Sequence, residues 1–387
     1  MRLVIVGGGF AGVWAAAAAA RVRQRAARDL EISVVSPGPD LVLRPRLYQA
    51  DPAAMRVPLA HLLGPIGVDH QRAAVTGIDV ATGQIRAGAA THGFDRLVLA
   101  SGSHLVTPDL PGAGHLHDID TIESATALDA HLHSLAGRHR TTAVVVGAGF
   151  TGLELATELV HRLRVIGPEP RVVLVERAPV LAPDLGPGPR PVALDALARL
   201  GVDLRLGVTV REVGRSHVDL SDGTTLPADT VVWTAGQRAS ALTAQFDAPR
   251  DHLGRLRVDP YLRVEGTPTV YAAGDTAAAP AGDARLVTQS CQHAIQTGKR
   301  AGANAAADLL GLPLDPFRAN PYVTCLDLGA AGAVYTTGWE RSVLHVGQEA
   351  KDHKNRINEE YIYPPLNDAG EFLRRADPAT VPASAVV

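Results

Sequence analysis

Apolar residues along the chain gather in short runs that alternate with longer helical stretches. Leu3–Val6 is a continuous aliphatic run that passes into glycines and then into the alanine-rich stretch Val13–Ala20. A short apolar run bounded by glycine is typical of a buried strand. Glu31–Val35 is a second such run, so the start of the chain is predicted to form a β-α-β unit with parallel strands.

The same pattern occurs again further along the chain. Ala143–Val146 is strand-like, a helical stretch follows, and Arg171–Val175 is the second strand. In both copies the first strand leads into Gly-x-Gly-x-x-Gly. The distance from the first glycine to the end of the second strand is also the same, 29 residues from Gly7 to Ser36 and from Gly147 to Glu176. Two copies in the same register indicate two dinucleotide-binding units.

The glycines have the same physical role in both copies. The first permits a tight turn, the second lets the backbone approach a pyrophosphate, and the third lets the helix pack on the strand. The pyrophosphate then lies at the positive end of the helix. The loop residues expected to contact nucleotides are Gly7, Gly9, Phe10, Ala11 and Gly12 in the first copy, and Gly147, Gly149, Phe150, Thr151 and Gly152 in the second.

Three later apolar runs, at 95–100, 229–234 and 269–273, each end in small residues. The first two runs are predicted to be the last strands of the two nucleotide-binding units. Because parallel strands end at the same edge of a sheet, the residues after them are expected near the glycine loops. The residues expected at the nucleotide sites are therefore Ser101, Gly102, Ala235, Gly236, Gly274 and Asp275. A helix is predicted to follow from about Gln289 to Leu310, where Gly311 and Pro313 end it.

These elements predict an α/β fold with two Rossmann-like, three-layer ββα dinucleotide-binding domains and a small C-terminal α+β region. The first domain is predicted to comprise residues 1–115 and 240–316. The second is inserted at 116–239, with Leu110–Gly114 as the hinge. The remaining region is 317–387.

Within the C-terminal region the pattern predicts two strands, one helix and a polar tail. The strands are expected at Tyr322–Leu328 and Gly332–Thr337, and the helix at Gly347–Glu360. This helical stretch has almost no apolar face, so membrane contact is not favoured. No run is long enough to span a bilayer and no export signal is visible, so we expect a cytoplasmic protein.

Composition excludes several classes of function. The chain has 37 basic and 40 acidic residues, so no basic excess favours nucleic-acid binding. Only Lys299, Lys351 and Lys354 are lysines. The 15 histidines show no metal-ligand spacing, and no structural metal is expected. Two cysteines, Cys291 and Cys325, exclude a disulfide scaffold.

The ordered motifs resemble those of the two-dinucleotide-binding flavoproteins, the pyridine nucleotide-disulfide oxidoreductase superfamily, over about residues 1–340. Within it the chain looks most like type II NADH dehydrogenases, which are NADH:quinone oxidoreductases. The resemblance implies FAD on the first unit and NADH on the second. It also implies that Asp275 holds the ribityl hydroxyls, and that hydride passes from NADH to flavin N5 and electrons then reach a quinone or another small acceptor.

Ribose recognition departs from this pattern in the first unit. An acid is expected at the end of the second strand, where this chain has Ser36; either Ser36 makes a weaker hydrogen bond or Asp40 reaches back. In the second unit the acid is present as Glu176, which favours NADH over NADPH. Arg177 next to it leaves NADPH as the less favoured alternative.

Two further segments are expected beside the flavin. Arg44 and Arg46 lie where similar enzymes have an apolar stretch, so Arg46 either places a cation near the flavin or is a solvent-facing loop residue. Glu154 lies in the first turn of the second-unit helix, where a glutamate faces the nicotinamide in similar enzymes. The helix dipole favours an acid there in any case.

Glutamines 289, 292 and 296 share one face of the helix predicted after residue 289. They form either a solvated polar stripe or part of the flavin and quinone site, which the resemblance favours. Here the chain keeps Gln292, Gln296 and Gly298 but has Thr297 in place of a glutamine. His293 and Ala294, next to Gln292, are included among the expected cofactor contacts.

The resemblance leaves three functions open. The first is NADH oxidation with a quinone-like acceptor. The second is sulfide or thiol oxidation through Cys291 and Cys325, although the two cysteines are 34 residues apart and lack the spacing of a redox pair. The third is an NADH-binding, charge-transfer flavoprotein of the apoptosis-inducing-factor type that acts through partners. Dimers are common in similar proteins, and a homodimer is included among the expectations.

Overall fold

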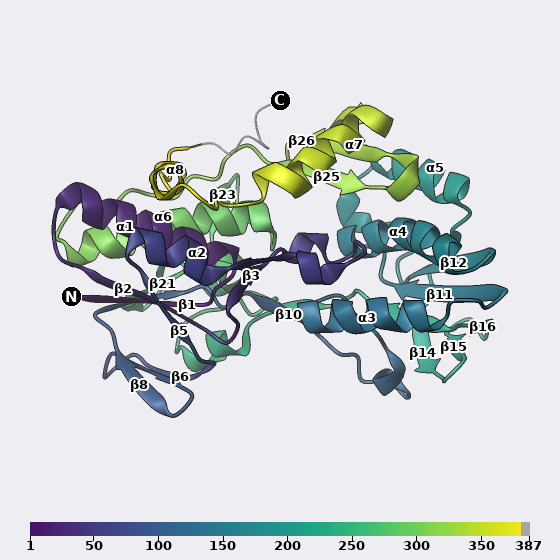
Figure 1. Cartoon of the computed structure of the whole chain (residues 1–387), viewed down its shortest axis with the longest axis horizontal. Coiled ribbons are helices and arrows are strands. Elements are labelled where there is room, and N and C mark those ends of the chain that lie inside the picture. The colour runs from purple at the N-terminus through teal and green to yellow at the C-terminus, as the bar shows by residue number, and fades with distance from the viewer. Residues whose placement is uncertain (381–387) are drawn as a thin grey trace.

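Two parallel sheets, one in each lobe of the molecule, organise the chain (Figure 1). The structure is a computed structural model that describes residues 1–380. The first sheet has six strands, in the order β20 (Arg263–Val264), β21 (Thr267–Ala272), β9 (Arg96–Leu99), β1 (Arg2–Val6), β2 (Glu31–Ser36) and β5 (Asp69–Arg72). All its pairs are parallel except β20 with β21. The carboxyl ends of the parallel strands β1, β2, β9 and β21 therefore lie at one edge of the sheet.

The second sheet repeats the arrangement with four strands. Their order is β13 (Asp203–Leu206), β12 (Glu169–Glu176), β11 (Arg140–Val146) and β17 (Thr230–Trp233), and every pair is parallel. β11 and β12 correspond to β1 and β2 of the first sheet. The predicted α/β fold with two Rossmann-like units is therefore confirmed.

Each unit has a helical layer on one side of its sheet and other elements on the opposite side (Figure 1). The helices are α1 (Phe10–Ala26), α2 (Leu59–Leu63) and α6 (Cys291–Leu309) in the first lobe, and α3 (Ile122–Ser134), α4 (Phe150–Ile166) and α5 (Arg190–Leu200) in the second. The antiparallel meanders are β6 (Val75–Asp79), β7 (Gln84–Ala87) and β8 (Ala90–Gly93), and β14 (Val210–Val213), β15 (His217–Leu220) and β16 (Thr225–Pro227). Smaller pairs are β3 (Asp40–Val42) with β4 (Arg56–Pro58), β19 (Leu256–Arg257) with β22 (Ala277–Ala278), and β23 (Pro280–Gly282) with β24 (Arg285–Leu286).

The alanine-rich helix α1 packs very closely on α6. A Cβ atom added to Gly298 would lie 2.4 Å from the carbonyl oxygen of Ala11, and one on Gly302 would lie 2.0 Å from that of Ala15. The two backbones are therefore nearly in contact, which requires small residues on both helices. This explains why Ala15–Ala20 are all buried although an alanine run forms no amphipathic pattern.

The two lobes are joined by a pair of antiparallel connections. β10 (Ser103–Leu105) leaves the first lobe and pairs with β18 (Gln237–Ala239), which returns to it. The predicted hinge at Leu110–Gly114 follows β10. Gly112 there packs against the backbone of Val213, because an added Cβ would lie 1.8 Å from the carbonyl oxygen of Val213.

The C-terminal segment spans both lobes (Figure 1). It contains the antiparallel strands β25 (Val323–Asp327), β26 (Ala333–Thr337) and β27 (Ser342–Val346), then α7 (Gly347–Arg356), a π-helical turn (Ile357–Tyr361) and α8 (Ala369–Arg375). Residues 381–387, the end of the predicted C-terminal region, lie outside the described residues.

The prediction of a polar tail was wrong for α8. Phe372 of this helix is only 1% exposed and packs edge-on against Trp14 of α1, with the ring centroids 5.2 Å apart. Ala369 and Leu373 of α8 and Ala376 just after it pack on the same core as Phe372. The spacing i, i+3, i+4 and i+7 is that of a short amphipathic helix, so the sequence carried a signal that the prediction overlooked. β27 was also missed.

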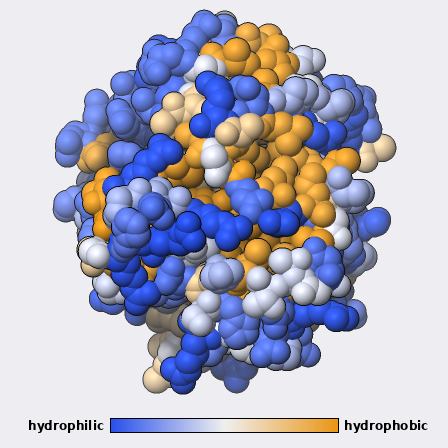
Figure 2. All heavy atoms as spheres, turned by 90° about the vertical axis from the view of Figure 1, so that its right-hand side faces the viewer, coloured by the Kyte–Doolittle hydropathy of each residue, from blue (hydrophilic) through white to orange (hydrophobic). Residues whose placement is uncertain are grey.

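Apolar surface is visible at the end of the molecule that carries the second lobe and the C-terminal sheet (Figure 2). β27 contributes three exposed apolar side chains, Val343, Leu344 and Val346, with exposed fractions of 37%, 45% and 48%. α7 exposes no large apolar side chain. Within residues 1–380 no helix is both long and apolar enough to cross a membrane.

Candidate functional site

The two glycine loops have matching geometry. Gly7 and Gly147, the first glycines, have φ angles of 118° and 103°, which strongly favour glycine. The third glycines touch the first: a Cβ atom on Gly12 or on Gly152 would lie 1.8 Å from the carbonyl oxygen of its partner. The space around the second glycines, Gly9 and Gly149, is open to 4 Å. Each loop thus has the predicted turn, close packing and approachable backbone.

The first loop also has an unsatisfied polar group at its edge. A Cβ atom on Gly7 would lie 2.2 Å from the carbonyl oxygen of Ala100 and 3.1 Å from the nitrogen of Ser101. The hydroxyl oxygen of Ser101 is buried and has no hydrogen-bond partner within the described chain. A buried hydroxyl without a partner is costly, so this position suits a ligand that offers one.

The carboxyl ends of β2 and β12 differ in chemistry. Ser36 donates a hydrogen bond to the carbonyl oxygen of Gly38 (3.1 Å) and lies 2.9 Å from Nε2 of His70. Asp40 faces Arg56 instead, at 3.7 Å, so it does not reach back to replace the missing acid.

In the second unit, Glu176 accepts hydrogen bonds from the backbone N–H groups of Ala148 (2.9 Å) and Ala178 (2.8 Å). Its carboxylate is therefore fixed against the glycine loop. Arg177 is exposed beside it.

A polar cluster surrounds Asp275 in the turn after β21. The carboxylate accepts a hydrogen bond from Ser103 (2.6 Å) and lies 3.8 Å from Nη1 of Arg44. Arg44 is also paired with Asp120, at the start of the second lobe. Burial raises the pKa of the Asp275 carboxyl. The predicted residues Arg44 and Asp275 are thus brought together, with Ser103 between them.

Thr297, where the chain departs from the family pattern, supports this turn. Its hydroxyl accepts a hydrogen bond from the Gly274 N–H (2.9 Å) and donates one to the carbonyl oxygen of His293 (2.7 Å). Ala294 also lies against Gly274, where an added Cβ would be 3.5 Å from the Ala294 Cβ. The threonine therefore fastens the Asp275 turn to the first turns of α6.

Three buried polar atoms on α6 have no hydrogen-bond partner in the described chain: Oε1 of Gln292, Nε2 of His293 and Nε2 of Gln296. The other amide atoms are used, since Gln292 donates to the carbonyl oxygen of Val323 and Gln296 accepts the N–H of Asn320. Gln296 is 7% exposed and His293 1%, so this face is not a solvated stripe. Burial lowers the pKa of His293 to about 4, and its ring is neutral at physiological pH.

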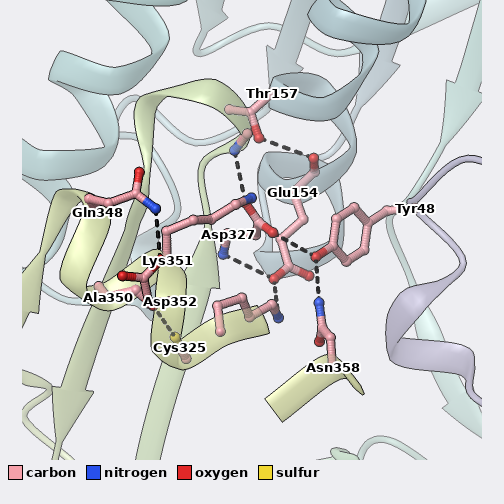
Figure 3. A network of polar contacts seen from close by, with 12 residues as sticks. Tyr48, Glu154, Thr157, Cys325, Asp327, Gln348, Ala350, Lys351, Asp352 and Asn358 are labelled. Carbon is pink, nitrogen blue, oxygen red and sulfur yellow. Dashed lines mark hydrogen bonds and ion pairs between the residues drawn. The ribbon is translucent and has the colours of Figure 1, made fainter. Parts of the chain in front are cut away.

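Glu154 lies in a buried network that joins α4 to the C-terminal segment (Figure 3). Its Oε1 atom accepts hydrogen bonds from Nζ of Lys354 (2.7 Å) and from the N–H of Asp327 (3.1 Å). Asp327 in turn accepts the Tyr48 hydroxyl (2.9 Å) and is paired with Lys351 (2.5 Å). Asn358 donates to the Tyr48 oxygen.

Burial and charge pairing act in opposite directions on the Glu154 carboxyl. Burial raises the pKa of Glu154, and the Lys354 ammonium opposes that rise. The Glu154 carboxylate raises the pKa of Lys354 in turn. Lys354 and Asp327 were missed from the sequence. The signal available was that two of only three lysines in an arginine-rich chain lie three positions apart on one charged helix.

Hydrogen bonds connect the start of α6 to both polar centres. Gln289, just before the helix, donates to the carbonyl oxygen of Asp275 (3.4 Å), and Gln292 donates to that of Val323 at the start of β25 (2.9 Å). The other end of β25, Asp327, donates its N–H to Glu154. The Asp275 turn, the glutamine face of α6 and Glu154 are therefore connected through the start of α6 and β25.

Comparison with known proteins agrees with this geometry. Residues 1–298 match the model of the pyridine nucleotide-disulphide oxidoreductases. The chain belongs to this family. It is 48% identical to an NADH dehydrogenase-like protein of Mycobacterium tuberculosis, over 98% of this chain and 99% of that protein. It is 31% identical to the demethylphylloquinone reductase of a Synechocystis species, over 86% of each chain.

Solved structures share the fold of this oxidoreductase. NDH2 of Plasmodium falciparum in complex with NADH has a TM-score of 0.79 at 12% identity and covers 96% of this chain and 97% of that one. The sulfide:quinone oxidoreductase of Aquifex aeolicus has a TM-score of 0.77 at 18% identity, over 98% and 92%.

The cysteines of this family member are not activated. Burial raises the pKa of Cys291 to about 11 and that of Cys325 to about 12. Cys325 donates a weak hydrogen bond to the carbonyl oxygen of Ala350 (3.6 Å). Both residues are thiols at neutral pH, whereas nucleophilic sulfur chemistry needs a thiolate. Across residues 1–380, no group of three or more His, Cys, Asp or Glu side chains is arranged to hold a metal.

Arg46 contacts the C-terminal segment. Its guanidinium donates to the Tyr363 hydroxyl (2.8 Å) and to Oε1 of Gln49 (3.0 Å), and the side chain is half-buried. Arg46 is therefore not a free loop arginine, because its bond to Tyr363 joins the start of the chain to the C-terminal segment.

Proposed function

We propose that the protein is an FAD-dependent NADH dehydrogenase that passes electrons to a quinone or another small acceptor. The observation that carries this proposal is that hydrogen bonds join the Asp275 turn to the start of α6, and join its glutamine face through β25 to Glu154. The proposal includes the predicted division of the chain into domains. Residues 1–115 and 240–316 form the first nucleotide-binding domain, residues 116–239 the inserted second one, and residues 317–387 the C-terminal region. A cytoplasmic location and a homodimer stay predictions from the sequence.

The first unit fits FAD. The loop around Gly7, Gly9 and Gly12 offers an open, positively polarised helix end for the pyrophosphate, with the Ser101 hydroxyl at its edge. Asp275 supplies a fixed acceptor for ribityl hydroxyls. When bound, the flavin would accept electrons from NADH and release them to the acceptor.

The second unit fits NADH rather than NADPH. Glu176 is held in place by two backbone N–H groups, so its free lone pairs suit the 2′-hydroxyl, and its charge opposes a 2′-phosphate. Glu154 is fixed by Lys354 and by the backbone of Asp327, which suits a group that orients the nicotinamide.

The α6 face suits an acceptor that carries carbonyl oxygens. Nε2 of Gln296 is a buried donor without a partner, and it would stabilise negative charge on such an oxygen without changing its own protonation state. The relatives named as quinone reductases support a quinone as this acceptor. The protonated state of both thiols disfavours the sulfide-oxidising alternative.

Replacing Asp275 by alanine tests the flavin assignment. We expect the purified wild-type protein to be yellow with one FAD per chain, and Asp275→Ala to lose most of it, because an ordered acceptor for the ribityl hydroxyls disappears. The absorbance ratio of flavin to protein measures the occupancy.

Asp247→Ala, which removes an exposed acid of the same predicted domain, is the control and should retain its flavin. Full occupancy in Asp275→Ala would contradict the assignment. Bleaching of the wild-type flavin by sulfide but not by NADH would favour the thiol-oxidising alternative.

A further inference from the structure

The tip of the β26–β27 hairpin reaches from the C-terminal sheet to the second nucleotide unit. A Cβ atom added to Gly188, just before α5, would lie 3.0 Å from the carbonyl oxygen of Arg341 at this tip. Arg341 itself has a φ of 51°, in the left-handed region that arginine seldom adopts. The hairpin thus contacts the second unit through its backbone and holds Arg341 in a strained conformation.

The Arg341 guanidinium lies at the start of α4. Its central carbon is 5.2 Å from the centre of the Phe150 ring and 5.8 Å from that of Tyr322. One nitrogen donates to the Tyr322 hydroxyl at 3.3 Å. Phe150 is the first residue of α4 and directly follows Gly149 of the glycine loop, so the cation is stacked on the loop that would hold the nucleotide.

No acid neutralises this cation in the described chain. Arg341 forms no ion pair within residues 1–380, and its Nε atom is buried without a hydrogen-bond partner. The neighbouring Glu340 is paired with Arg285 instead (2.9 Å). A partly buried guanidinium without a counter-charge is unfavourable.

The nearby end of α4 adds positive charge to the same place. α4 begins after Gly149 with no side-chain cap and no acid in its first turn. Glu154, which the sequence placed in that turn, is the fifth residue of the helix and is paired with Lys354. Its N-terminal N–H groups therefore carry the positive end of the helix dipole. The space around Gly149 is open to 4 Å. The cation on the Phe150 ring, the helix N-terminus and the open space beside Gly149 thus belong to two successive residues of the chain, and together they favour a multiply charged anion.

We propose that Arg341 binds the pyrophosphate of the pyridine nucleotide, so that the C-terminal hairpin forms one wall of the NADH site; this inference rests on the proposed binding of NADH by the second unit. A guanidinium presents several donors that match phosphate oxygens. The family model ends at residue 298, so this contact comes from a part of the chain that the family match does not include.

ADP-ribose is the probe that tests the inference, because it has the adenosine and the pyrophosphate but no nicotinamide. Calorimetry on the flavin-loaded protein should show that Arg341→Gln weakens ADP-ribose binding by about 10-fold to 100-fold, the scale of a lost charge-assisted hydrogen bond. Arg341→Lys keeps the charge and should lose less. Adenosine, which lacks phosphate, should bind all these proteins equally.

Arg285→Gln is the matched control. It removes a cation beside the same hairpin, but Arg285 pairs with Glu340 and stacks on Trp339 rather than on Phe150. Arg285→Gln should bind ADP-ribose with the affinity of the wild-type protein. All the variants should also keep the flavin content of the wild type.

Unchanged ADP-ribose binding by Arg341→Gln would overturn the inference, as would an equal loss for adenosine, which would indicate a distorted site. If Arg341→Gln loses its flavin, the same binding measurements are made on Arg341→Lys. If Arg341→Lys loses affinity for ADP-ribose and for adenosine to the same extent, the inference is again contradicted. A wild-type protein that binds neither ADP-ribose nor NADH would instead contradict the proposed function.

Discussion

At the scale of single residues, the buried pair Glu154–Lys354 determines the character of the site. The side chains are about one-tenth exposed, and they come from parts of the chain 200 residues apart. A charge buried in this way is tolerated only while its partner is present. The pair therefore ties the second nucleotide unit to the C-terminal helix and fixes Glu154 where the nicotinamide is proposed to bind.

Replacing Lys354 by methionine should expose this dependence. Lys354→Met leaves the Glu154 carboxylate buried without its cation, and we expect the free energy of unfolding to fall by about 3–5 kcal/mol. Glu154→Gln in the same chain should restore much of the loss. Thermal unfolding of the two single variants and the double variant measures the coupling.

The pH dependence of Lys354→Met has a definite sign. Burial raises the pKa of Glu154 above its value in the unfolded chain, so the folded protein holds its proton more tightly. The variant should therefore be most stable below the unfolded pKa and lose stability as the pH rises through the folded pKa. Equal destabilisation of Lys354→Met at pH 5 and pH 8 would show that Glu154 is not the group left unpaired.

The same pair shows how far the sequence alone could go. Glu154 was predicted because similar enzymes have a glutamate at this position, two residues after the third glycine of the motif. Lys354 was not, because its partner depends on how the C-terminal helix docks, and no local pattern records that. Ser36 was identified as a departure from the family, but its contact with His70 needed the register of β2 with β5.

At the scale of secondary-structure elements, the packing of α1 on α6 places the site. α6 carries the glutamine face at its beginning and lies against the glycine loop helix α1 along much of its length. The crossing depends on Gly298 and Gly302, where the helix backbones are closest. The existence of both helices was predicted from their patterns, whereas their close contact was not.

Adding one methyl group at this crossing should separate the helices. The Cβ of Gly302→Ala would lie 2.0 Å from the carbonyl oxygen of Ala15, so backbone must move. We expect a loss of about 1–3 kcal/mol or more, as for other overpacked cores. Gly64→Ala is the control, since Gly64 has helical φ and ψ angles and open space around it.

Chemical unfolding compares the two glycine variants directly. Equal stability of Gly302→Ala and Gly64→Ala would mean that the helices tolerate a wider spacing than the structure shows. A fall in flavin content for Gly302→Ala alone would connect the crossing to the first glycine loop, which starts α1.

At the scale of the whole molecule, different parts of the chain are proposed to serve the two halves of the reaction. Glu154, Glu176 and the second glycine loop serve NADH, and Gln292 and Gln296 of α6 serve the acceptor. Gln296→Leu removes the amide at nearly constant volume. We expect NADH to reduce the flavin normally in this variant while reoxidation by a quinone slows about 10-fold to 100-fold. Unchanged reoxidation would place the acceptor elsewhere.

Anaerobic stopped-flow mixing of the flavin-loaded wild-type protein with NADH or NADPH, followed by mixing with a water-soluble quinone, is the decisive measurement. NADH should bleach the flavin absorbance with a higher kcat/KM than NADPH, and the quinone should restore the absorbance within one catalytic turnover. A flavin that NADH does not reduce, or a reduced flavin that no quinone reoxidises, would contradict the proposal that this protein is an NADH:quinone oxidoreductase.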